Sequence, residues 1–326
     1  MKKKLLVTGG AGFIGGNFIH YMMERYPDYE IYNLDALTYA GDLAKHRGLE
    51  GNTRYHFIQG EIGDRTMMLS LFEKEEFDYV IHFAAESHVD RSIVDPGVFV
   101  RTNVLGTQVL LDAALKIGVA KFVQVSTDEV YGDLDFDPET FFTEESPLKP
   151  NSPYSASKAS ADLMARAYHE TYGLPVNILR CSNNYGPFQF PEKLIPLAIT
   201  KAMNGEKVPV YGDGRNVRDW LHVRDHCAAI DLVLHKGIIG EVYNVGGHHE
   251  RTNLEVVKSI IQSLGKSEEL IEFVSDRPGH DRRYAIDASR LEGLGWKQEY
   301  NFETGLKQTI QWYSANMWWW EPLVKK

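Results

Sequence analysis

The sequence contains little cysteine and no long apolar run. Its two cysteines among 326 residues, Cys181 and Cys227, are far apart and lack metal-ligand spacing, so no disulfide framework is expected. Free thiols are typical of the reducing cytosol. No stretch approaches the roughly 20 apolar residues that span a bilayer, and the apolar run after the lysines at positions 2–4 is too short for a signal peptide. We therefore expect a cytoplasmic protein with no membrane partner.

The chain is also short of positive charge. It has 35 lysines and arginines against 45 aspartates and glutamates, which gives a net charge of −10. Binding to nucleic acid needs a basic surface, so no nucleic-acid partner is expected. No His, Cys and carboxylate set has recognisable ligand spacing, so no metal is expected either. A small anionic substrate would require a local basic pocket.

The first 180 residues do contain a regular alternation of apolar and amphipathic segments. Short apolar runs predict strands at 4–8, 30–34, 54–58, 79–83, 122–126 and 176–180. Helical patterns lie between them at 13–25, 66–74, 98–116 and 155–172. Apolar strands separated by helices are typical of a parallel sheet covered on both faces. The predicted fold class is therefore α/β, with a doubly wound, Rossmann-type parallel sheet.

The pattern changes after residue 185, where glycine and proline interrupt the remaining segments. We interpret residues 1–185 as the sheet domain and residues 186–326 as a smaller, irregular domain that covers one edge of the sheet. Segment 241–245 is expected to return to the main sheet as a further strand. The run Trp318-Trp319-Trp320 is interpreted as a tail docked on its own domain, with a contact between subunits as the alternative.

Polar clusters follow the predicted strands at the points where they end. They lie at 9–15, at Asp35, and at 84–87, 126–129 and 181–184, after the first, second, fourth, fifth and sixth strands. In a parallel sheet these carboxyl ends share one edge, and ligands of such sheets bind there. The sequence therefore predicts one ligand site along this edge.

The first cluster is a glycine loop, Thr8-Gly9-Gly10-Ala11-Gly12-Phe13-Ile14-Gly15, between a predicted strand and a predicted helix. Glycine lets the backbone turn sharply and approach a pyrophosphate, whose charge then meets the amino end of the helix. Asp35 lies 20 residues after Gly15, at the end of the next strand. A carboxylate there can accept hydrogen bonds from both ribose hydroxyls and would repel a 2′-phosphate. NAD is thus favoured over NADP, and an aspartate that only caps a turn is the alternative.

Tyr154 and Lys158 form a second candidate group. They are four residues apart on one helix face, so both can reach the same ligand. A free tyrosine has a pKa of about 10, and a nearby ammonium with an oxidised nicotinamide would favour its phenolate. That phenolate could take the proton from a sugar hydroxyl while the carbon's hydride moves to NAD. The alternative is a surface helix pair.

The triplet Thr127-Asp128-Glu129 follows the fifth predicted strand. A dehydrogenase alone has no need of two adjacent carboxylates. If one is protonated and the other ionised, the pair supplies an acid and a base together, and its titrations belong to both. This combination predicts a dehydratase that uses its nicotinamide as a temporary hydride store. Acidic residues that only start a turn after a strand are the alternative.

Positive charge gathers in the second half of the chain, in segments rich in glycine and proline. Its members are Lys193, Arg215, Arg218, Arg277, His280, Arg282 and Arg283. The planar fork of arginine suits a diphosphate, whereas a solvated charged face is the alternative. His82 sits within an apolar strand and is interpreted as a core residue with satisfied hydrogen bonds.

Taken together, these motifs resemble a known family. The glycine loop with Tyr154 and Lys158 resembles the extended short-chain dehydrogenases/reductases. Within that group, the runs at 83–92, 126–132 and 276–284 resemble those of the dTDP-glucose 4,6-dehydratases over nearly the whole chain. The Thr-Asp-Glu triplet discriminates, because related epimerases and decarboxylases typically lack it. The resemblance implies an NAD-dependent hydro-lyase that converts dTDP-glucose to dTDP-4-keto-6-deoxy-glucose and water, in dTDP-rhamnose biosynthesis.

The resemblance also implies a role for each catalytic residue. Tyr154, aided by Lys158 and Thr127, would deprotonate the glucose 4-hydroxyl while NAD takes the C4 hydride. Glu129 would then remove the C5 proton, acidified by the 4-ketone, and Asp128 would protonate the departing 6-hydroxyl. Return of the hydride to C6 would complete a redox-neutral cycle.

The remaining expectations concern binding and assembly. By the same resemblance, residues 1–185 would bind NAD through Gly9, Gly12, Phe13, Ile14, Gly15, Asp35, Leu37, Thr38, Glu61, Ile62, Ala84, Ala85, Ser87, Thr102, Tyr154 and Lys158. Residues 186–326 would mainly hold the nucleotide sugar, and the full substrate set is Ser87, Thr127, Asn183, Lys193, Leu194, Pro209, Tyr211, Arg218, Asn253, Arg277 and His280. Glu61 departs from relatives, which usually carry aspartate beside the adenine, but its longer side chain can keep an acceptor there.

Relatives form dimers through two long helices, here 98–116 and 155–172, which implies a homodimer.

Rivals of two classes can be weighed against the dehydratase: another enzyme on the same scaffold, and a non-catalytic protein. A sugar-nucleotide 4-epimerase or a UDP-glucuronate decarboxylase needs no acid to expel water, so Asp128 and Glu129 argue against both. A non-catalytic NAD-binding regulator has no need of Tyr154, Lys158 and the two carboxylates together. The base of the nucleotide stays open on the residues alone, and thymine is favoured by the resemblance.

Overall fold

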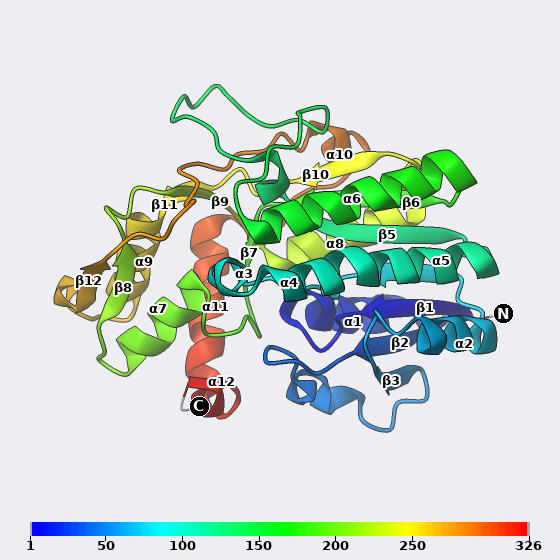
Figure 1. The fold of residues 1–326 in the computed structure, drawn as a ribbon. Coiled ribbons are helices and arrows are strands. Elements are labelled where there is room, and N and C mark those ends of the chain that lie inside the picture. Colours follow the sequence, from blue (N-terminus) through cyan, green and yellow to red (C-terminus); the bar gives the residue numbers. More distant parts are fainter. Residues whose placement is uncertain (1, 325–326) are drawn as a thin grey trace.

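The computed structural model describes residues 2–324, and its centre is a seven-stranded sheet. All neighbouring strands of this sheet are parallel, in the order β10-β6-β5-β4-β1-β2-β3 (Figure 1). Their bounds are β1 Lys3–Thr8, β2 Tyr29–Asp35, β3 Tyr55–Gln59, β4 Tyr79–His82, β5 Lys121–Thr127, β6 Val176–Cys181 and β10 Val242–Val245. The predicted doubly wound parallel sheet is confirmed.

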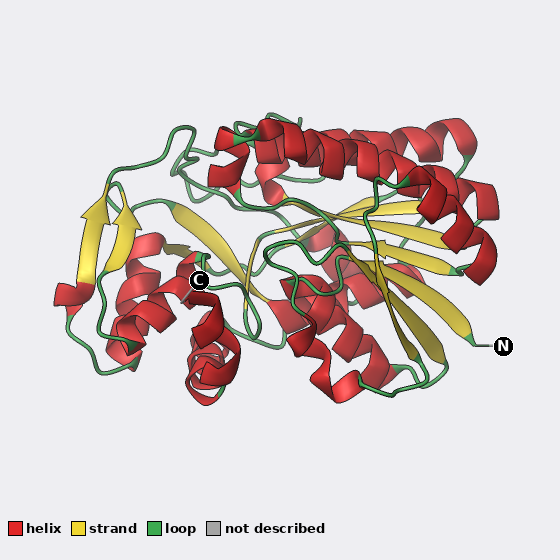
Figure 2. Ribbon diagram, turned by 60° about the horizontal axis from the view of Figure 1, so that its bottom comes forward, coloured by secondary structure: helices red, strands yellow, loops and turns green. Residues whose placement is uncertain are grey.

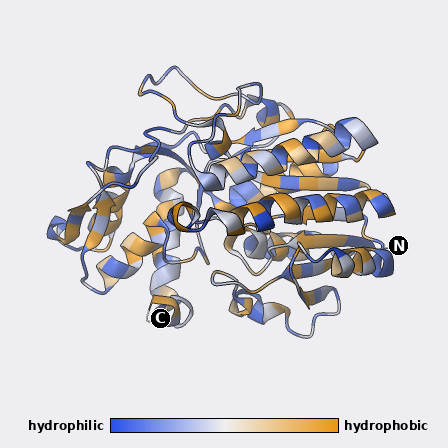
Figure 3. Cartoon of the chain, in the orientation of Figure 1, coloured by the Kyte–Doolittle hydropathy of each residue, from blue (hydrophilic) through white to orange (hydrophobic). Residues whose placement is uncertain are grey.

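Helices cover both faces of the sheet, as Figure 2 shows. They are α1 Phe13–Arg25 and α8 Val223–Lys236 on one face, and α2 Arg65–Glu75, α5 Thr107–Ile117 and α6 Pro153–Tyr172 on the other. Successive strand residues point to opposite faces. Val7 and Ile81 therefore pack in the cluster with α1 and α8, and Leu6 and Val80 in the cluster with the other three helices. Figure 3 shows the main strands as mostly hydrophobic, as burial on both faces requires.

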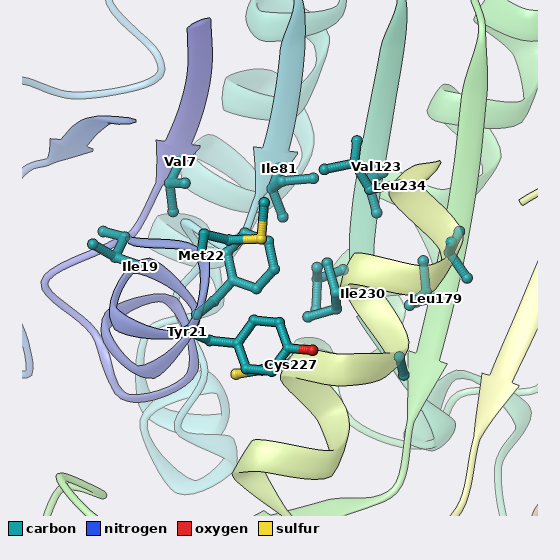
Figure 4. Packing of buried hydrophobic residues seen from close by; sticks show 14 of the residues in the cluster. Val7, Ile19, Tyr21, Met22, Ile81, Val123, Leu179, Cys227, Ile230 and Leu234 are labelled. Carbon is teal, nitrogen blue, oxygen red and sulfur yellow. The ribbon is translucent and has the colours of Figure 1, made fainter. Parts of the chain in front are cut away.

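The packing between α1 and α8 fixes the helix that follows the glycine loop. Tyr21 and Met22 of α1 lie against Cys227 and Ile230 of α8, all of them buried (Figure 4). The hydroxyl of Tyr21 donates a hydrogen bond of 3.2 Å to Asp231 on α8. Cys227 is thus a packing residue, and both cysteines are free thiols.

One predicted helix, 98–116, has a more complex structure. It is built from α4 Pro96–Phe99, a π-helical stretch η2 Val100–Gly106, and α5. The wide turns contain the buried Asn103, whose Nδ2 donates to the Glu86 carbonyl and to Ser157 Oγ at 3.0 and 2.8 Å. The apolar periodicity continues through this segment, so the sequence pattern did not reveal the π-helix. Such π stretches often occur at functional sites.

A smaller domain lies beyond the carboxyl ends of the main strands (Figure 1). Its strands are β7 Asn183–Tyr185, β9 Val217–His222 and β11 Glu250–Thr252 in one sheet, and β8 Val208–Tyr211 with β12 Ile271–Val274 in another. Its main helices are α7 Leu194–Met203, α9 Asn253–Ser263, α11 Phe302–Ala315 and α12 Met317–Val324. Two later segments return to the main sheet. The strand β10 was expected to pair there, and the helix α8 also packs against the sheet.

Candidate active site

A cavity of about 760 Å³ lies along the carboxyl ends of the main strands, where the sequence predicts a ligand site. Most of the predicted residues line it, from the glycine loop at one end to the smaller domain at the other. They are Gly9, Gly12, Phe13, Ile14, Gly15, Asp35, Thr38, Glu61, Ile62, Ala84, Ala85, Ser87, Thr102, Thr127, Asp128, Glu129, Tyr154, Lys158, Asn183 and Lys193. The fold thus brings together residues as far apart in the chain as Gly9 and Lys193.

The glycine loop can accept no side chain at its two critical positions. Gly9 has a φ of +72°, and a Cβ there would lie 2.6 Å from the backbone nitrogen of Ala84. A Cβ on Gly15 would lie 2.5 Å from the Gly9 carbonyl oxygen. The bare backbone leads directly into the amino end of α1, which favours bound negative charge. This end of the cavity therefore fits a pyrophosphate.

Asp35 is held in place by two backbone donors. Its Oδ2 accepts the Ala11 N–H at 2.9 Å, and its Oδ1 accepts the Leu37 N–H at 2.8 Å. Burial raises the pKa of Asp35, and these two N–H groups oppose that rise. A fixed carboxylate beside the glycine loop fits the ribose of a dinucleotide without a 2′-phosphate. Leu37 itself, at a φ of +54°, lies outside the cavity lining and contributes its backbone N–H to Asp35.

The five candidate catalytic residues come from three elements, β5, η3 and α6. β5 ends at Thr127, and a short 3₁₀ turn, η3 Asp128–Tyr131, follows with the Thr127 hydroxyl as its N-cap. That hydroxyl accepts the Glu129 N–H at 3.3 Å and donates to Asp128 Oδ1 at 3.3 Å. α6 begins at Pro153 with a Ser152/Ser155 capping box, so Tyr154 and Lys158 lie in its first two turns.

Lys158 lines the cavity, and its ammonium group is hydrogen-bonded to strand β5. Its Nζ donates to the Val125 carbonyl at 2.7 Å, and its side chain is buried. Burial lowers the pKa of Lys158, and the carboxylate of Asp162, one turn further along α6, opposes that effect. Asp162 in turn accepts a hydrogen bond of 3.0 Å from Arg180 Nε. This network holds the ammonium at one position beside the cavity.

The pKa of Tyr154 shows what its predicted role as a base depends on. Burial, and next the negative charge of Glu129, raise the pKa of Tyr154 well above its usual range. The Thr127 hydroxyl opposes this only weakly, and Lys158 is hydrogen-bonded to a backbone carbonyl instead. The side chains of the site therefore favour the neutral phenol. A phenolate requires added positive charge from the bound ligands.

Asp128 and Glu129 differ in how readily they ionise. Burial first, and then the charge of Glu129, raise the pKa of Asp128 well above its ordinary value. Burial also raises the pKa of Glu129, but Arg277, Arg218 and Lys193 oppose that rise. The Oδ2 atom of Asp128 is buried and has no hydrogen-bond partner among residues 2–324. These shifts favour ionisation of Glu129 before Asp128, so the pair can supply an acid and a base together.

This arrangement predicts that Asp128→Asn stabilises the fold at neutral pH. A carboxyl group whose pKa rises on folding binds its proton more tightly in the folded state, so stability falls as pH rises above the unfolded value of 3.8. The amide carries no charge, and we expect a gain on the order of 1 kcal/mol, typical of removing such functional strain. Thermal unfolding followed by circular dichroism should show the gain at pH 7.5 and its decline toward pH 4.5.

An exposed carboxylate provides the matched control for this prediction. A hydrogen bond from Arg282 lowers the pKa of Asp213, so its contribution to stability is present above its unfolded pKa and is lost at low pH. Asp213→Asn should therefore lower the unfolding temperature slightly at pH 7.5, in the opposite direction. A gain in Asp128→Asn that is the same at both pH values would contradict burial of a strained carboxyl group.

The predicted substrate residues of the smaller domain fall into two groups. Asn183 and Lys193 line the cavity, and Lys193 Nζ donates to the Ser87 carbonyl at 3.1 Å. The others lie outside the cavity lining: Leu194, Pro209, Tyr211, Arg218, Asn253, Arg277 and His280. The charges of Arg218 and Arg277 nevertheless act on the pKa of Glu129. These two arginines therefore lie close enough to influence the reaction centre.

A hydrogen-bonded group surrounds Arg277. Its Nη1 donates to Asp90 Oδ1 at 3.1 Å, and the Tyr211 hydroxyl lies 3.4 Å from the other oxygen of Asp90. The His280 ring lies against that of Tyr211, and its Nδ1 is 2.6 Å from Asp276. The predicted residues Tyr211, Arg277 and His280 thus lie together: Tyr211 and Arg277 share Asp90, and His280 pairs with Asp276.

Arg283 does not belong to an anion site, contrary to the sequence interpretation. Its Nε and Nη2 donate to the two carboxylate oxygens of Glu250 at 2.7 and 3.0 Å. Its Nη1 donates to the carbonyls of Asp137 and Thr140 at 2.8 and 3.0 Å. The side chain is buried and holds the loop that follows η3. All of its donors serve the fold, whereas Arg282 pairs with Asp213 at the surface.

Several cavity residues had no recognisable signal in the sequence. Lys45, in the 3₁₀ helix η1 Leu43–Leu49, lines the glycine end of the cavity and donates to the Ala11 carbonyl at 2.7 Å. Glu192 also lines the cavity and accepts a hydrogen bond of 2.9 Å from the Tyr39 hydroxyl, and the Arg91 guanidinium lies 3.6 Å from the centroid of the Tyr39 ring. Lysines and tyrosines in polar loops are usually solvated, so only tertiary structure reveals these positions.

His82, at the end of the central strand β4, is a core residue as predicted. Its ring nitrogens lie 2.7 and 3.0 Å from the hydroxyls of Thr8 and Thr107. Burial lowers the pKa of His82 to about 3, so the ring is neutral. Among residues 2–324, no group of three or more His, Cys, Asp and Glu side chains could hold a metal ion.

A glycine loop on a parallel seven-stranded sheet, with a Tyr-x-x-x-Lys pair at the same edge, defines the extended short-chain dehydrogenase/reductase class. A family model described as GDP-mannose 4,6 dehydratase matches residues 6–309. A dTDP-glucose 4,6-dehydratase of Xanthomonas campestris pv. campestris (strain B100) is 55% identical over 334 aligned positions, which cover 96% of this chain and 94% of the relative. The chain belongs to the dTDP-glucose 4,6-dehydratase family.

Two solved structures support this assignment. The dTDP-glucose 4,6-dehydratase of Bacillus anthracis str. Ames, determined in complex with NAD, is 53% identical and superposes with a TM-score of 0.92. The enzyme of Streptomyces venezuelae, determined with NAD and TYD bound, is 50% identical with a TM-score of 0.95. In both cases the match covers 98% of this chain and 99% of the other.

Proposed function

We propose that this chain is an NAD-dependent dTDP-glucose 4,6-dehydratase, a hydro-lyase that forms dTDP-4-keto-6-deoxy-glucose and water. We assign its product to dTDP-rhamnose biosynthesis. The observation that carries the proposal is the pair Asp128 and Glu129, which lines the cavity beside Tyr154. Their unequal pKa shifts supply the acid and base that an elimination needs and that an epimerisation does not.

The cofactor is proposed to bind at the glycine end of the cavity. Asp35 would hold the adenosine ribose, the bare backbone of the glycine loop would face the pyrophosphate, and Lys158 would hold the nicotinamide ribose. The other predicted cofactor residues on the cavity wall would pack around these groups. When bound, NAD supplies a reversible hydride acceptor that oxidises C4 of the sugar and later reduces C6.

Tyr154 is proposed to take the proton of the sugar 4-hydroxyl. Its phenol lies in the first turn of α6, with Thr127 beside it and the ammonium of Lys158 one turn away. Thr127 would orient the 4-hydroxyl, while Lys158 would stabilise the phenolate during transfer. Since burial and then the charge of Glu129 raise the pKa of Tyr154, proton transfer would be favoured only when the positively charged ring of an oxidised nicotinamide is present.

Glu129 and Asp128 are proposed to carry out the elimination. The 4-ketone acidifies the C5 proton, and the ionised Glu129 removes it. The protonated Asp128 donates its proton to the C6 oxygen, so the C6–O bond breaks and water leaves. When C6 is reduced, Glu129 would return its proton to C5. The proton that Tyr154 took from the 4-hydroxyl then balances the proton that Asp128 lost to water, and exchange with solvent would reset these two groups.

The diphosphate of the substrate is proposed to bind at the smaller domain. Arg218 is buried, packs on the Tyr284 ring at 4.3 Å and donates to the Asp281 carbonyl at 2.9 Å. Its charge, with those of Lys193 and Arg277, provides the basic pocket that an acidic protein needs for an anionic substrate. The other predicted substrate residues would contact the sugar and the base, for which we propose thymine.

Product analysis tests this function. The purified protein, supplied with NAD and dTDP-glucose but no reductant, should yield a product that has lost one water and gained a 4-keto group. Mass spectrometry and NMR distinguish the outcomes. An unchanged mass with inverted C4 would identify an epimerase, and turnover of UDP-glucose in place of dTDP-glucose would correct the proposed base.

We further propose that the enzyme is a homodimer. The helical run Pro96–Ile117 is 22 residues long with a mean hydropathy of 1.2, which is long and apolar enough for a membrane span by these criteria, although half of it is buried in the fold. This finding revises the expectation that no such stretch exists. This run and its neighbours α3 Val89–Val94 and α6 carry the exposed apolar residues Ile93, Val94, Val100, Leu163 and Tyr172. Burial of this face against a second copy accounts for its composition.

A charge on this face should separate the subunits. We expect Leu163→Glu to convert the dimer to a monomer, because Leu163 is 57% exposed in the single chain and a buried, unpaired carboxylate is costly. Light scattering after size-exclusion chromatography measures the mass. Phe273→Glu on β12, at a residue that is also 57% exposed, should stay dimeric. A wild-type monomer, or an unaffected Leu163→Glu, would refute the proposed interface.

The proposed location is the cytoplasm. Both thiols are free and buried, which fits a reducing compartment. A soluble nucleotide-sugar substrate would be available there.

A further inference from the structure

The C-terminal helix α12 packs between two segments that line the cavity. Trp319 and Trp320 are almost completely buried, and Trp320 Nε1 donates to the Tyr313 carbonyl at 2.8 Å. Trp318, in contrast, is 44% exposed. In Figure 1, α12 (red) follows α11 at the bottom of the smaller domain. The tail is therefore docked on its own domain, with Trp319 and Trp320 buried and Trp318 partly at the surface.

On one side, Trp319 contacts the segment that supports the glycine loop. The Nζ atom of Lys45 lies 5.7 Å from the centroid of the Trp319 ring. The same Nζ donates to the carbonyl of Ala11, whose own N–H is bound by Asp35. Burial lowers the pKa of Lys45 to about 8, and Asp42 and Asp35 oppose that fall. Lys45 thus connects Trp319 to Asp35, which is proposed to hold the ribose, and to the glycine loop, which is proposed to hold the pyrophosphate.

On the other side, Trp319 packs against the segment that forms the opposite wall. Phe188 lines the cavity, and its ring centroid lies 5.5 Å from that of Trp319 and 4.6 Å from that of Trp312. The backbone of Phe188 has a φ of +67°, a left-handed conformation that a bulky residue rarely adopts. Surrounding packing must hold it there. The hydroxyl of Tyr313, from α11, also donates to the neighbouring Gln189 carbonyl.

From these contacts we infer that Trp319 is a positioning residue for the cofactor, acting through Lys45. Trp319 does not itself line the cavity or touch the proposed reacting atoms, but it packs against two residues that do line the cavity, Lys45 and Phe188, and holds them in position. This inference rests on the proposed function, because it concerns the NAD site of that enzyme. It gives the tryptophan tail a role beyond packing: α12 couples the smaller domain to retention of the cofactor.

The test measures NAD affinity directly, without turnover. Trp319→Leu keeps an apolar side chain but loses the aromatic face, and Lys45→Met keeps the length of lysine but loses the ammonium. Isothermal titration of the cofactor-free protein with NAD should show affinity reduced roughly tenfold in each, as expected if the binding-competent fraction falls to about one tenth. Lys45→Arg should retain most of the affinity, because it keeps a donor for the Ala11 carbonyl.

Two features separate positioning from a general loss of stability. Trp318→Leu, on the exposed neighbour that stacks with Arg47 at 4.3 Å, should bind NAD like the wild type. In Trp319→Leu, the KM for dTDP-glucose at saturating NAD should be unchanged. The double variant Trp319→Leu/Lys45→Met should bind no more weakly than the weaker single variant, because both act through one contact.

The possible failures are distinguishable. If the wild type binds NAD and Trp319→Leu binds it equally well, even with a lowered unfolding temperature, the tail is only structural and the inference is overturned. If the two substitutions add fully, Trp319 does not act through Lys45. A wild type that binds no NAD would overturn the proposed function itself, and this inference with it.

Discussion

In Glu129→Gln, reduced cofactor should accumulate while formation of the keto-deoxy sugar falls by about 10²–10⁴-fold, the usual contribution of a positioned general base. Oxidation at C4 precedes the step assigned to Glu129, so that half of the cycle stays intact. The amide cannot accept the C5 proton, and the hydride then has no C6 acceptor. The substitution also removes a negative charge that raises the pKa values of Asp128 and Tyr154, which favours the first step further.

The measurement is a single turnover with enzyme in excess over dTDP-glucose. The absorbance of reduced nicotinamide is followed in a stopped-flow instrument, and the sugar product is quantified after quenching. Glu206→Gln, at an exposed glutamate paired with Lys201 at the end of α7, is the matched control and should behave like the wild type. Product formation at the wild-type rate in Glu129→Gln would transfer the C5 base to another residue.

Tyr154→Phe should abolish the first step instead of the second. The phenylalanine ring fills the same space but cannot take the 4-hydroxyl proton, so we expect oxidation to slow by about 10³-fold, within the range for general bases. No reduced cofactor should accumulate in a single turnover. Affinity for NAD should stay close to that of the wild type, because the ring is retained and Lys158 is anchored independently by the Val125 carbonyl.

The control for this substitution lies on the same helix. Tyr172→Phe removes a hydroxyl from an exposed tyrosine at the far end of α6 and should leave both steps unchanged. The two catalytic variants thus predict opposite signals, with reduced cofactor present in Glu129→Gln and absent in Tyr154→Phe. Normal formation of reduced cofactor in Tyr154→Phe would assign the oxidation base elsewhere, and the raised pKa of Tyr154 makes this a strict test.

The main sheet could be predicted from the sequence because its signal is local. Each buried strand is a short apolar run, and each covering helix shows its own periodicity, so α1 was predicted with its observed bounds, Phe13–Arg25. The π-helical stretch Val100–Gly106 could not be predicted, since its apolar pattern matches that of an ordinary helix. It depends on Asn103, whose partners Glu86 and Ser157 are distant in sequence.

The site was partly predictable for a similar reason. Residues that follow strand ends must meet at one edge of a parallel sheet, which placed Asp35, Ser87 and Thr127 at one cavity before any contact was known. The partners of long charged side chains follow no such rule. Arg283 binds loop carbonyls and Glu250, and Lys45 turns inward to Ala11, because tertiary packing decides where each charge lies. Likewise, the pKa of Tyr154 depends on burial and on Glu129, which spacing along the chain does not show.

The central claim is that one cavity oxidises C4, eliminates water and reduces C6 with the same hydride. The most direct test uses dTDP-glucose carrying deuterium at C4, incubated with the enzyme and unlabelled NAD in ordinary water. Our account predicts a 4-keto-6-deoxy product with the deuterium at C6, located by NMR. A product without deuterium at C6, or a C4 epimer that keeps the label at C4, would contradict it.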